Sequence, residues 1–507
     1  MELYTSSDIK LLENNIDGIL NKLQEKRMSL FGPSMDEIKQ VTNILHKFIK
    51  DNKRKVYGGY ALNLYIKDKN PDDAIYSDKD ITPHDIEFYS PEPVKDLIEL
   101  CNLIHDKGIP YVVGKDAIHK ETYKLTVNMI DYCDISYVPK NVYNRMPFKI
   151  INGFNLIDPS FMTVDYLRML SDPINSYWRI EKSFKRFILL NKYYPLTIIK
   201  KELTLNESKN EIVNKLLENI LSFLKNKKTT ILIGLYALNF YINQSGILKN
   251  YNKKYITLNK VPYYEIISIN FKEDTNNLIN ILTKLVDNKD DIKIVEHYPF
   301  FQFIGHSAYI YYQDILIAKI IHHYNKCLPK QDIIYGTYDY NKYIKLDEMS
   351  IIQIGTFNVT LLFALTFMFQ VRTDNLMDET NFYRIMCSHL IESRNYFYNN
   401  NHKLNIFSES YFKDFSTDCI GSTLSPERER QKLYESQKKK GKRAFFKYEP
   451  SEKKINRDDT KYIFLNSSGN PVINKKNLKL SDDINNDDMD SDNDDSENII
   501  NNDIIDN

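Results

Sequence analysis

Two acidic residues that stand two positions apart in a short apolar run are the strongest chemical signal in the chain. Asp85-Ile86-Glu87-Phe88 has the composition of a β-strand, and side chains alternate along a strand, so both carboxylates lie on one face. Neighbouring carboxylates repel each other unless a cation lies between them, and a metal ion is the natural occupant. The alternative is an edge strand whose charged positions face water.

A third acid from a neighbouring strand would complete a metal site, and the segment VNMIDYCDISYV offers two candidates. Asp131 and Asp134 are three positions apart, so a regular strand cannot point both at one pocket. We favour Asp134, because Cys133 and Ile135 can pack behind it and a later repeat keeps Asp314 at the corresponding place. Asp131 remains the alternative.

The stretch VYGGYALNLYI, residues 56–66, places two glycines between a short apolar run and a helical pattern. A Gly-Gly turn lets backbone N–H groups approach a phosphate, and the start of a helix adds a favourable partial charge. Gly58 and Gly59 are therefore candidates to hold the phosphates of a nucleotide beside the sheet carboxylates. The alternative is a tight turn made for packing.

A further acidic pair, Asp78 and Asp80, lies in the long segment between the glycine turn and Asp85. In a strand, Lys79 between them would point its charge toward the core. We therefore rank this pair well below Asp85 and Glu87.

The segment SYWRIEKSFKRFILL, residues 176–190, predicts a helix with one apolar and one basic face. Lys182, Lys185 and Arg186 on the basic face are candidates to bind the nucleotide or grip a nucleic acid. A solvated face with extended lysine side chains explains the same pattern equally well.

An internal repeat determines how the rest of the chain is interpreted. LIGLYALNFYI, residues 232–242, matches VYGGYALNLYI, and similar strand and helix patterns follow each stretch. We infer a duplication with one copy over about residues 50–150 and a second over about residues 226–325.

The second copy lacks the acidic pair. The repeat places Tyr264 and Ile266 where the first copy has Asp85 and Glu87, with Glu265 facing the other way, and Leu235 replaces Gly59. We therefore expect the second copy to be catalytically inactive. Its expected role is architectural, helping to build a groove for RNA.

The predicted fold class is α+β, with two lobes that each contain a mixed sheet and flanking helices. The predicted boundaries are 1–50 for N-terminal helices, 51–150 for the active lobe, 151–225 for a helical connection, 226–325 for the degenerate lobe, 326–480 for a helical C-terminal region and 481–507 for a disordered acidic tail. A basic segment at 425–447 ends in aromatic residues, which either stack on RNA bases or belong to a solvated linker.

Composition sets outer limits on function. Lys plus Arg and Asp plus Glu both total 68 in the 507 residues, so net charge does not indicate a polyanionic partner. Five scattered cysteines without a CxxC pair favour a reducing compartment and no structural zinc. The N-terminus has no secretion signal. The longest apolar stretch, 351–370, has polar interruptions that favour a buried core helix over a membrane span.

The order of Gly-Gly, helix, acid-x-acid strand and later acid resembles the DNA polymerase β-like nucleotidyltransferase superfamily. The segments GGYALN, TPHDIEFYSP, DYCDISYVP and SYWRIEKSFKRF are similar to segments of the catalytic poly(A) polymerases of large cytoplasmic DNA viruses, of the mimivirus and African swine fever virus type. One departure is the longer segment between Gly59 and Asp85.

The resemblance implies a template-independent adenylyltransferase that adds AMP from ATP to RNA 3′ ends. It implies that Asp85, Glu87 and Asp134 hold two Mg²⁺ or Mn²⁺ ions. It further implies a homodimer that acts in the host cytoplasm at the virus factory, with packaging in the virion as a further option. The alternatives are a uridylyl- or CCA-type transferase and a non-catalytic RNA-binding or processivity subunit.

Overall fold

The computed structural model describes residues 3–31, 33–76, 84–205, 210–300, 304–323, 326–334, 350–373, 377–441, 444–452, 464–465 and 471–472. The chain divides into the unit Met1–Ser451 and the unit Glu452–Asn507. In the second unit, β17 (Phe464–Leu465) pairs antiparallel with β18 (Pro471–Val472). Asp78, Asp80 and the predicted acidic tail lie outside the described residues. No described helix is long and apolar enough to cross a membrane.

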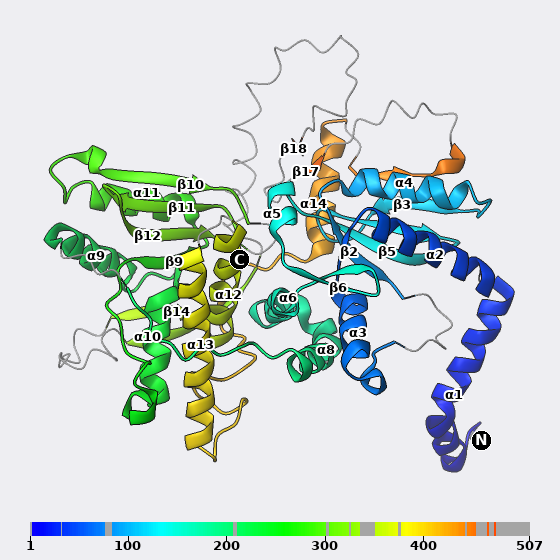
Figure 1. Cartoon of the computed structure of the whole chain (residues 1–507), viewed down its shortest axis with the longest axis horizontal. Coiled ribbons are helices and arrows are strands. Elements are labelled where there is room, and N and C mark those ends of the chain that lie inside the picture. Colours follow the sequence, from blue (N-terminus) through cyan, green and yellow to red (C-terminus); the bar gives the residue numbers. More distant parts are fainter. Residues whose placement is uncertain are drawn as a thin grey trace, which may run out of the picture. The chain divides into compact units, whose positions relative to one another are not determined.

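The first lobe is built on a mixed sheet with the strand order β16-β3-β4-β5-β2-β1-β7-β6 (Figure 1). Its strands are β1 (Lys55–Tyr57), β2 (Ile86–Ser90), β3 (Val112–Asp116), β4 (Thr122–Val127), β5 (Ile130–Tyr137), β6 (Phe148–Ile151), β7 (Phe154–Ile157) and β16 (Lys447–Tyr448). The strands β2 and β5 in the middle of this sheet run parallel to each other. Adjacent parallel strands place side chains of matching register on the same face.

The second lobe has its own sheet, with the order β10-β11-β12-β9-β8-β14-β13-β15. The strands are β8 (Thr230–Ile233), β9 (Tyr264–Ser268), β10 (Ile292–His297), β11 (Ser307–Tyr312), β12 (Ile315–His322), β13 (Leu328–Ile334), β14 (Ile351–Gly355) and β15 (Cys419–Ile420). Seven strands follow the same order in both sheets, with β1 matching β8 and β2 matching β9. The two lobes therefore repeat one topology, as the sequence predicts.

The helices extend this correspondence. The first lobe has α2 (Met35–Asp51), α3 (Gly58–Lys69), α4 (Pro93–His105), α5 (Lys140–Arg145), α6 (Pro159–Ser171), α7 (Pro173–Ser176) and α8 (Ile180–Tyr193); the second has α9 (Glu211–Leu224), α10 (Gly234–Ser245), α11 (Phe271–Leu282), α12 (Phe357–Thr373) and α13 (Met377–Asn400). α3 packs against α8, and α10 packs against α13 in the same way. The basic helix α8 is thus a part of the first lobe, although the sequence assigns it to a connecting region.

Both sheets also run past the predicted lobe boundaries at residues 150 and 325. The hairpin β6–β7 adds to the first sheet through the parallel pair β1 and β7, and β13–β14 adds to the second through β8 and β14. The apolar stretch from Ile351 divides between β14 and the buried helix α12. These strands were missed because they lie outside the region of sequence similarity.

Residues shared by the two glycine stretches are core residues. Tyr65 and Tyr241 are buried, and each donates a hydrogen bond from its hydroxyl to a carbonyl of the added hairpin, Leu156 or Gly355, at 3.2 and 2.8 Å. The shared residues of the repeated motif therefore pack each lobe's helix against its sheet.

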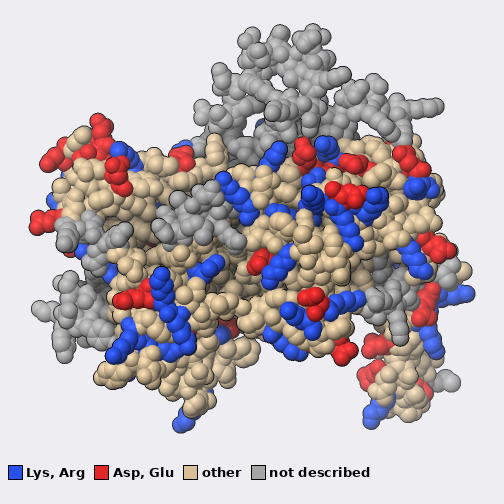
Figure 2. Space-filling model, in the orientation of Figure 1, with Lys and Arg blue, Asp and Glu red and all other residues tan. Residues whose placement is uncertain are grey.

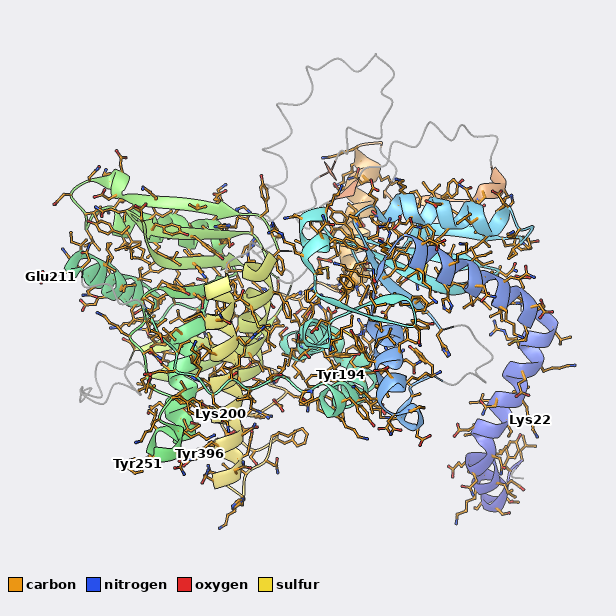
Figure 3. The ribbon with its side chains drawn as sticks, in the orientation of Figure 1. Lys22, Tyr194, Lys200, Glu211, Tyr251 and Tyr396 are labelled. Atoms are coloured by element: carbon orange, nitrogen blue, oxygen red, sulfur yellow. A yellow bond between two sulfur atoms is a disulfide. The ribbon has the colours of Figure 1, made fainter. Side chains whose placement is uncertain are left out.

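The segment between the lobes makes contacts with the second lobe. Tyr194 and Lys200, labelled in Figure 3, belong to this segment after α8. The amide of Ile199 donates to Ser388 Oγ, and His389 Nε2 donates to the carbonyl of Lys201, both at 2.9 Å. Phe161 of α6 also packs edge-on against Phe369 of α12.

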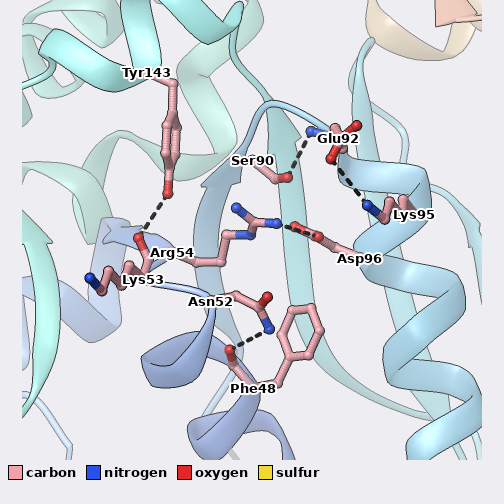
Figure 4. A network of polar contacts seen from close by, with 9 residues as sticks. All are labelled: Phe48, Asn52, Lys53, Arg54, Ser90, Glu92, Lys95, Asp96 and Tyr143. Carbon is pink, nitrogen blue, oxygen red and sulfur yellow. Dashed lines mark hydrogen bonds and ion pairs between the residues drawn. The ribbon is translucent and has the colours of Figure 1, made fainter. Parts of the chain in front are cut away.

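A buried ion pair fixes the basic turn that precedes the glycines (Figure 4). Arg54 lies 2.6 Å from Asp96 of α4, and the Tyr143 hydroxyl donates to the carbonyl of Lys53. Asp96 is almost fully buried. Arg54 therefore supports the fold, and its guanidinium is committed to a structural partner.

Cys327 and Cys419 form a disulfide between the segments that carry β13 and β15. The sequence predicted reduced cysteines, and this pair corrects that expectation. The pair is 92 residues apart in sequence, a separation that no local spacing reveals. Cys101, Cys133 and Cys387 are free and buried.

Candidate active site

Three acids meet where β2 and β5 lie side by side. Glu87 of β2 is the register partner of Asp134 of β5. Asp85 comes immediately before β2, two positions from Glu87, so it shares the face of Glu87. In addition to burial, the charge of Asp85 raises the pKa of both Glu87 and Asp134, and the charge of Glu87 also raises the pKa of Asp134. The structure thus brings the three predicted carboxylates together.

Asp131 approaches the same place because β5 is irregular. The pairing of β4 with β5 shifts between Leu125 and Thr126, as it does at a β-bulge, which turns a side chain from its regular direction. Lys124 of β4 consequently contacts both Asp131 at 3.0 Å and Asp134 at 3.4 Å. A regular strand would direct only one of the two acids to the site, whereas the irregular β5 brings both to Lys124.

Burial and mutual repulsion raise the pKa values of the carboxyl groups. Burial, followed by the negative charge of Asp85, raises the pKa of Asp134 to about 7, and Lys124 opposes that rise. Burial also raises the pKa of Glu87 and of Asp85. Carboxylates that are costly to ionise together favour a nearby cation. Such perturbed groups are typical of functional sites.

The glycine turn is shaped around a carboxylate of the cluster. Gly58 has φ +69°, and a Cβ there would lie 1.6 Å from Glu87 Oε2. The amide of Gly59 donates to the same oxygen at 2.9 Å. The N–H group that the sequence assigns to a phosphate is therefore bound to Glu87, and the side of Gly58 where a Cβ would project is occupied by that side chain.

Gly59 makes room for an arginine. A Cβ on Gly59 would lie 2.5 Å from the Tyr76 hydroxyl and 2.7 Å from Nη1 of Arg186. Arg186 donates to the Tyr76 hydroxyl at 2.9 Å, and Tyr76 stacks on His84. Asn63 of the repeated motif accepts hydrogen bonds from the amides of Ile75 and Tyr76, each at 2.9 Å. The turn therefore holds a guanidinium beside the carboxylates.

The other two predicted basic residues of α8, Lys182 and Lys185, differ in whether they act on the carboxylate cluster. Lys182 is exposed, and its charge opposes the pKa rise that burial causes at Asp85. Lys185 is also exposed and pairs with Glu181 on its own helix at 2.6 Å. Arg186 and Lys182 therefore belong to the site, whereas Lys185 lies on the solvated part of the helix.

Comparison with known proteins assigns the chain that carries this site to a protein family. A family model described as "Poly(A) polymerase catalytic subunit" matches residues 43–176, and a second, for the C-terminal part of the mimivirus catalytic subunit, matches residues 188–482. A protein of Acanthamoeba polyphaga mimivirus named "Putative poly(A) polymerase catalytic subunit" is 33% identical over 503 residues, which is 95% of this chain and 85% of that protein. The chain belongs to the viral poly(A) polymerase catalytic subunit family.

Two further relatives agree with this assignment. The crystal structure of the Megavirus polyadenylate synthase matches with a TM-score of 0.81 and 32% identity, over 94% of each chain. An African swine fever virus (strain Badajoz 1971 Vero-adapted) protein with the same name as the mimivirus one is 26% identical over 169 residues, or 32% of this chain and 35% of that protein. The chain is accordingly an enzyme, a transferase that makes poly(A).

The carboxylates of the polymerase fit a divalent cation, although they are not arranged as a formed metal centre. Among the described residues, no three His, Cys, Asp or Glu side chains are grouped as a metal site. Glu87 is bound to Gly59, and Asp134 contacts Lys124. Oδ1 of Asp85 is buried and has no hydrogen-bond partner within the described part of the chain. Carboxylate oxygens are the ligands that Mg²⁺ and Mn²⁺ prefer.

The second lobe of the polymerase retains the turn and one acid. Gly234 has φ +66°, and a Cβ there would lie 1.8 Å from Glu265 Oε2, as at Gly58 and Glu87. Ile233 pairs with Glu265, just as Tyr57 pairs with Glu87. Glu265 is therefore the structural counterpart of Glu87, and the alignment that placed Ile266 there is wrong by one residue.

The same strand register also changes which residues of the second lobe correspond to Asp85 and Asp134. Asp85 corresponds to Tyr263 instead of Tyr264, and Asp134 corresponds to Lys319, the register partner of Glu265. Asp314 lies in the turn between β11 and β12, where it is 95% exposed and pairs with Lys293. The second lobe thus carries one acid, one tyrosine and one lysine where the first has three acids.

Lys319 is buried in an aromatic cage at this position. Its ammonium lies 3.5 Å from Glu265 and donates to the Tyr383 hydroxyl at 2.8 Å, and Tyr383 in turn donates to Glu265 at 2.7 Å. The rings of Tyr263 and Tyr309 also face the ammonium. A positive charge fixed to the chain therefore lies next to the acid that corresponds to Glu87.

The aromatic residues of the basic segment are used within the fold. Segment 425–447 forms α14 (Pro426–Lys439) and leads into β16. The guanidinium of Arg430 lies 3.9 Å from the ring centre of Phe445, and Phe445 also stacks with Tyr434. Phe446 packs against Tyr123. These contacts argue against the predicted stacking of RNA bases on this segment.

Sequence reasoning missed several residues of the site. Lys124 and Tyr76 come from segments without a recognisable motif, and His84 lies in the TPHDIEFYSP motif but was not assigned a role. Lys124 is identified only by the antiparallel pairing that places it opposite Asp134. The partial signal for Tyr76 is Asn63, whose amide side chain holds the loop that carries it.

Proposed function

We propose that this polymerase is a template-independent adenylyltransferase that adds AMP from ATP to RNA 3′ ends. The observation that carries the proposal is the cluster of Asp85, Glu87 and Asp134 beside a glycine turn that holds a guanidinium. Carboxylates that bind cations, next to an arginine that binds phosphate, match the requirements of nucleotidyl transfer from a triphosphate. The family supports poly(A) synthesis.

The side chains of the first lobe have separate roles in this proposal. Arg186 and Lys182 neutralise the phosphate oxygens of ATP, and the glycine turn positions Arg186 for this contact. Asp85, Glu87 and Asp134 would hold two Mg²⁺ or Mn²⁺ ions, with Asp131 as the alternative third ligand. Ions bound there would lower the pKa of the RNA 3′-hydroxyl and withdraw charge from the reacting phosphate.

A primer-extension assay with each of the four nucleoside triphosphates tests the proposal. We expect a short unstructured RNA primer to be extended with ATP and much less with UTP, CTP or GTP. Preferred use of UTP, or limited addition of CTP and then ATP, would instead identify a uridylyl- or CCA-type transferase. If RNA is bound but no triphosphate gives a product, the chain is a non-catalytic RNA-binding or processivity subunit.

We further propose that the polymerase is a homodimer paired through α1 (Ser6–Phe31). Ile9, Leu12, Ile16, Ile19 and Leu23 are exposed, at alternating spacings of three and four residues. This is the spacing of a coiled-coil seam, which is stable only when a second helix covers it. A second copy of the chain supplies an identical helix.

The oligomeric state of a seam variant checks the dimer. Replacing Leu12, Ile16 and Ile19 together by glutamate is expected to convert a dimer into a monomer in light scattering, because like charges cannot pack in the seam. A matched variant with glutamate at Asn14 and Asn21, which lie opposite the seam by heptad spacing, should stay dimeric. A monomeric wild type, or an unchanged mass in the seam variant, contradicts pairing through α1.

We propose that the polymerase acts in the host cytoplasm at the virus factory, and packaging in the virion is a further option. The support for this location is the membership in a family of viral enzymes. Tagged protein followed by microscopy in infected cells, together with immunoblots of purified virions, would test both locations.

A further inference from the structure

We propose that Trp178 is a stacking site for an unpaired nucleobase beside the carboxylate cluster. Trp178 lies in the short helical turn η2 (Tyr177–Arg179) that leads into α8. Its side chain is 67% exposed, and Tyr177 next to it is 75% exposed. The proposal rests on the proposed function, because it requires a nucleotide or an RNA end at the cluster.

The helix places Trp178 at one end of a row that begins at the glycine turn. Lys182 and Arg186 are four residues apart on α8 and are therefore neighbours on one face, and Trp178 lies four residues before Lys182 in the turn η2 that leads into α8. Arg186 lies against Gly59, and the six residue steps of α8 from Ile180 to Arg186 span about 9 Å. The row therefore runs from a guanidinium at the turn, through an ammonium, to an aromatic ring, which matches phosphates followed by a base.

Arg179 links the indole to the cluster. Its guanidinium lies 5.1 Å from the centre of the Trp178 ring. Burial raises the pKa of Glu87, and both Arg186 and Arg179 oppose this rise through their charge. An indole backed by a cation, with the rest of its surface open, is a suitable partner for a flat base.

The surroundings of Trp178 differ from those of Phe445 and Phe446 in the basic segment. Phe445 and Phe446 of the basic segment are in contact with other rings, whereas Trp178 and Tyr177 are largely open. Figure 2 shows the molecule in the orientation of Figure 1. Lys and Arg side chains are visible on its surface where Figure 1 draws α6 and α8. Exposed rings among cations favour nucleic acid over an apolar protein partner.

Trp178 is the sole tryptophan of the chain, so its fluorescence reports directly on stacking. The probes are a 15-nucleotide oligo(A) RNA, ATP, and inorganic tripolyphosphate as a charge control without a base. We expect saturable quenching by the RNA or by ATP, and none by tripolyphosphate. Quenching by the RNA alone assigns the site to the primer, and quenching by ATP alone assigns it to the incoming nucleotide.

Substitutions measure what the ring contributes. Trp178→Ala is expected to raise the KM of the ligand that quenches by roughly 5- to 150-fold, since stacking on an aromatic ring contributes this much per base. Trp178→Phe should recover most of the loss. Tyr251→Ala is the matched control, because Tyr251 (labelled in Figure 3) is an 86% exposed aromatic residue of the second lobe, and it should change neither KM.

Two outcomes would overturn the proposal. One is an active polymerase that binds labelled RNA without any change in Trp178 fluorescence on addition of RNA or ATP. The other is equal quenching by tripolyphosphate, which would show a charge effect. Both leave nucleotidyl transfer intact, whereas failure of the proposed function appears as absent primer extension with every triphosphate.

Discussion

Replacing Asp85 by asparagine is expected to reduce primer extension by about 10³-fold or more while the protein stays folded. The substitution keeps the size of the side chain and removes one charge from the cluster that would hold the ions, a contribution of several kcal/mol to the transition state. Burial already raises the pKa of Asp85, so a neutral side chain there does not destabilise the fold. Extension rates and thermal melting of the same preparation measure both effects.

Controls for this prediction come from the second lobe and from β5. Tyr263→Phe changes the counterpart of Asp85 and should leave extension unchanged, because that lobe lacks the acid cluster. Asp131→Asn should cost less than Asp134→Asn, since Asp134 is the register partner of Glu87. Equal losses at Asp85 and Tyr263 would contradict the assignment of chemistry to the first lobe, and a larger loss at Asp131 would make it the third ligand.

Lys319→Met is expected to destabilise the second lobe by about 3–5 kcal/mol, the usual cost of removing one partner of a buried ion pair. Lys319 and Glu265 are 5% and 1% exposed, so water cannot replace the ammonium. Urea unfolding followed by circular dichroism, with extension activity as a separate probe of the first lobe, measures the loss.

The chain offers a matched control for Lys319. Lys293→Met removes an ion pair to the exposed Asp314, and exposed pairs contribute about 0–1 kcal/mol. The double variant Lys319→Met, Glu265→Gln should recover part of the stability, because the acid is no longer left charged and unpaired. Equal effects of the two single lysine variants would show that the cage does not hold an essential charge.

The general plan of this fold could be predicted from the sequence, because it depends on local patterns. Period-two alternation around Ile86 placed Asp85 and Glu87 on one face, and the repeated motif revealed the duplication. Both signals are carried by consecutive residues. The α+β class and the two lobes agree with the structure and with its Megavirus neighbour.

Details that depend on pairing between distant strands could not be predicted. The match of Asp85 and Glu87 with Tyr264 and Ile266 follows from aligning Pro83 with Pro262. The strand acid stands four residues after the first proline and only three after the second, so this alignment is wrong by one residue in the second lobe. The irregularity that brings Asp131 to Lys124 leaves no mark in the sequence. The membership of α8 in the first lobe became visible only through its packing on α3.

The exchange of Asp134 for Lys319 between the two lobes has a consequence for how each lobe depends on its surroundings. The positive charge beside Glu265 is carried by a lysine of the chain, whereas in the proposed two-ion site the first lobe would take up additional positive charge as dissolved ions. A ligand that binds the folded state stabilises it according to its concentration. Chelators should therefore act on the first lobe alone, and the second lobe can serve as a support that is unaffected by changes in the ion supply.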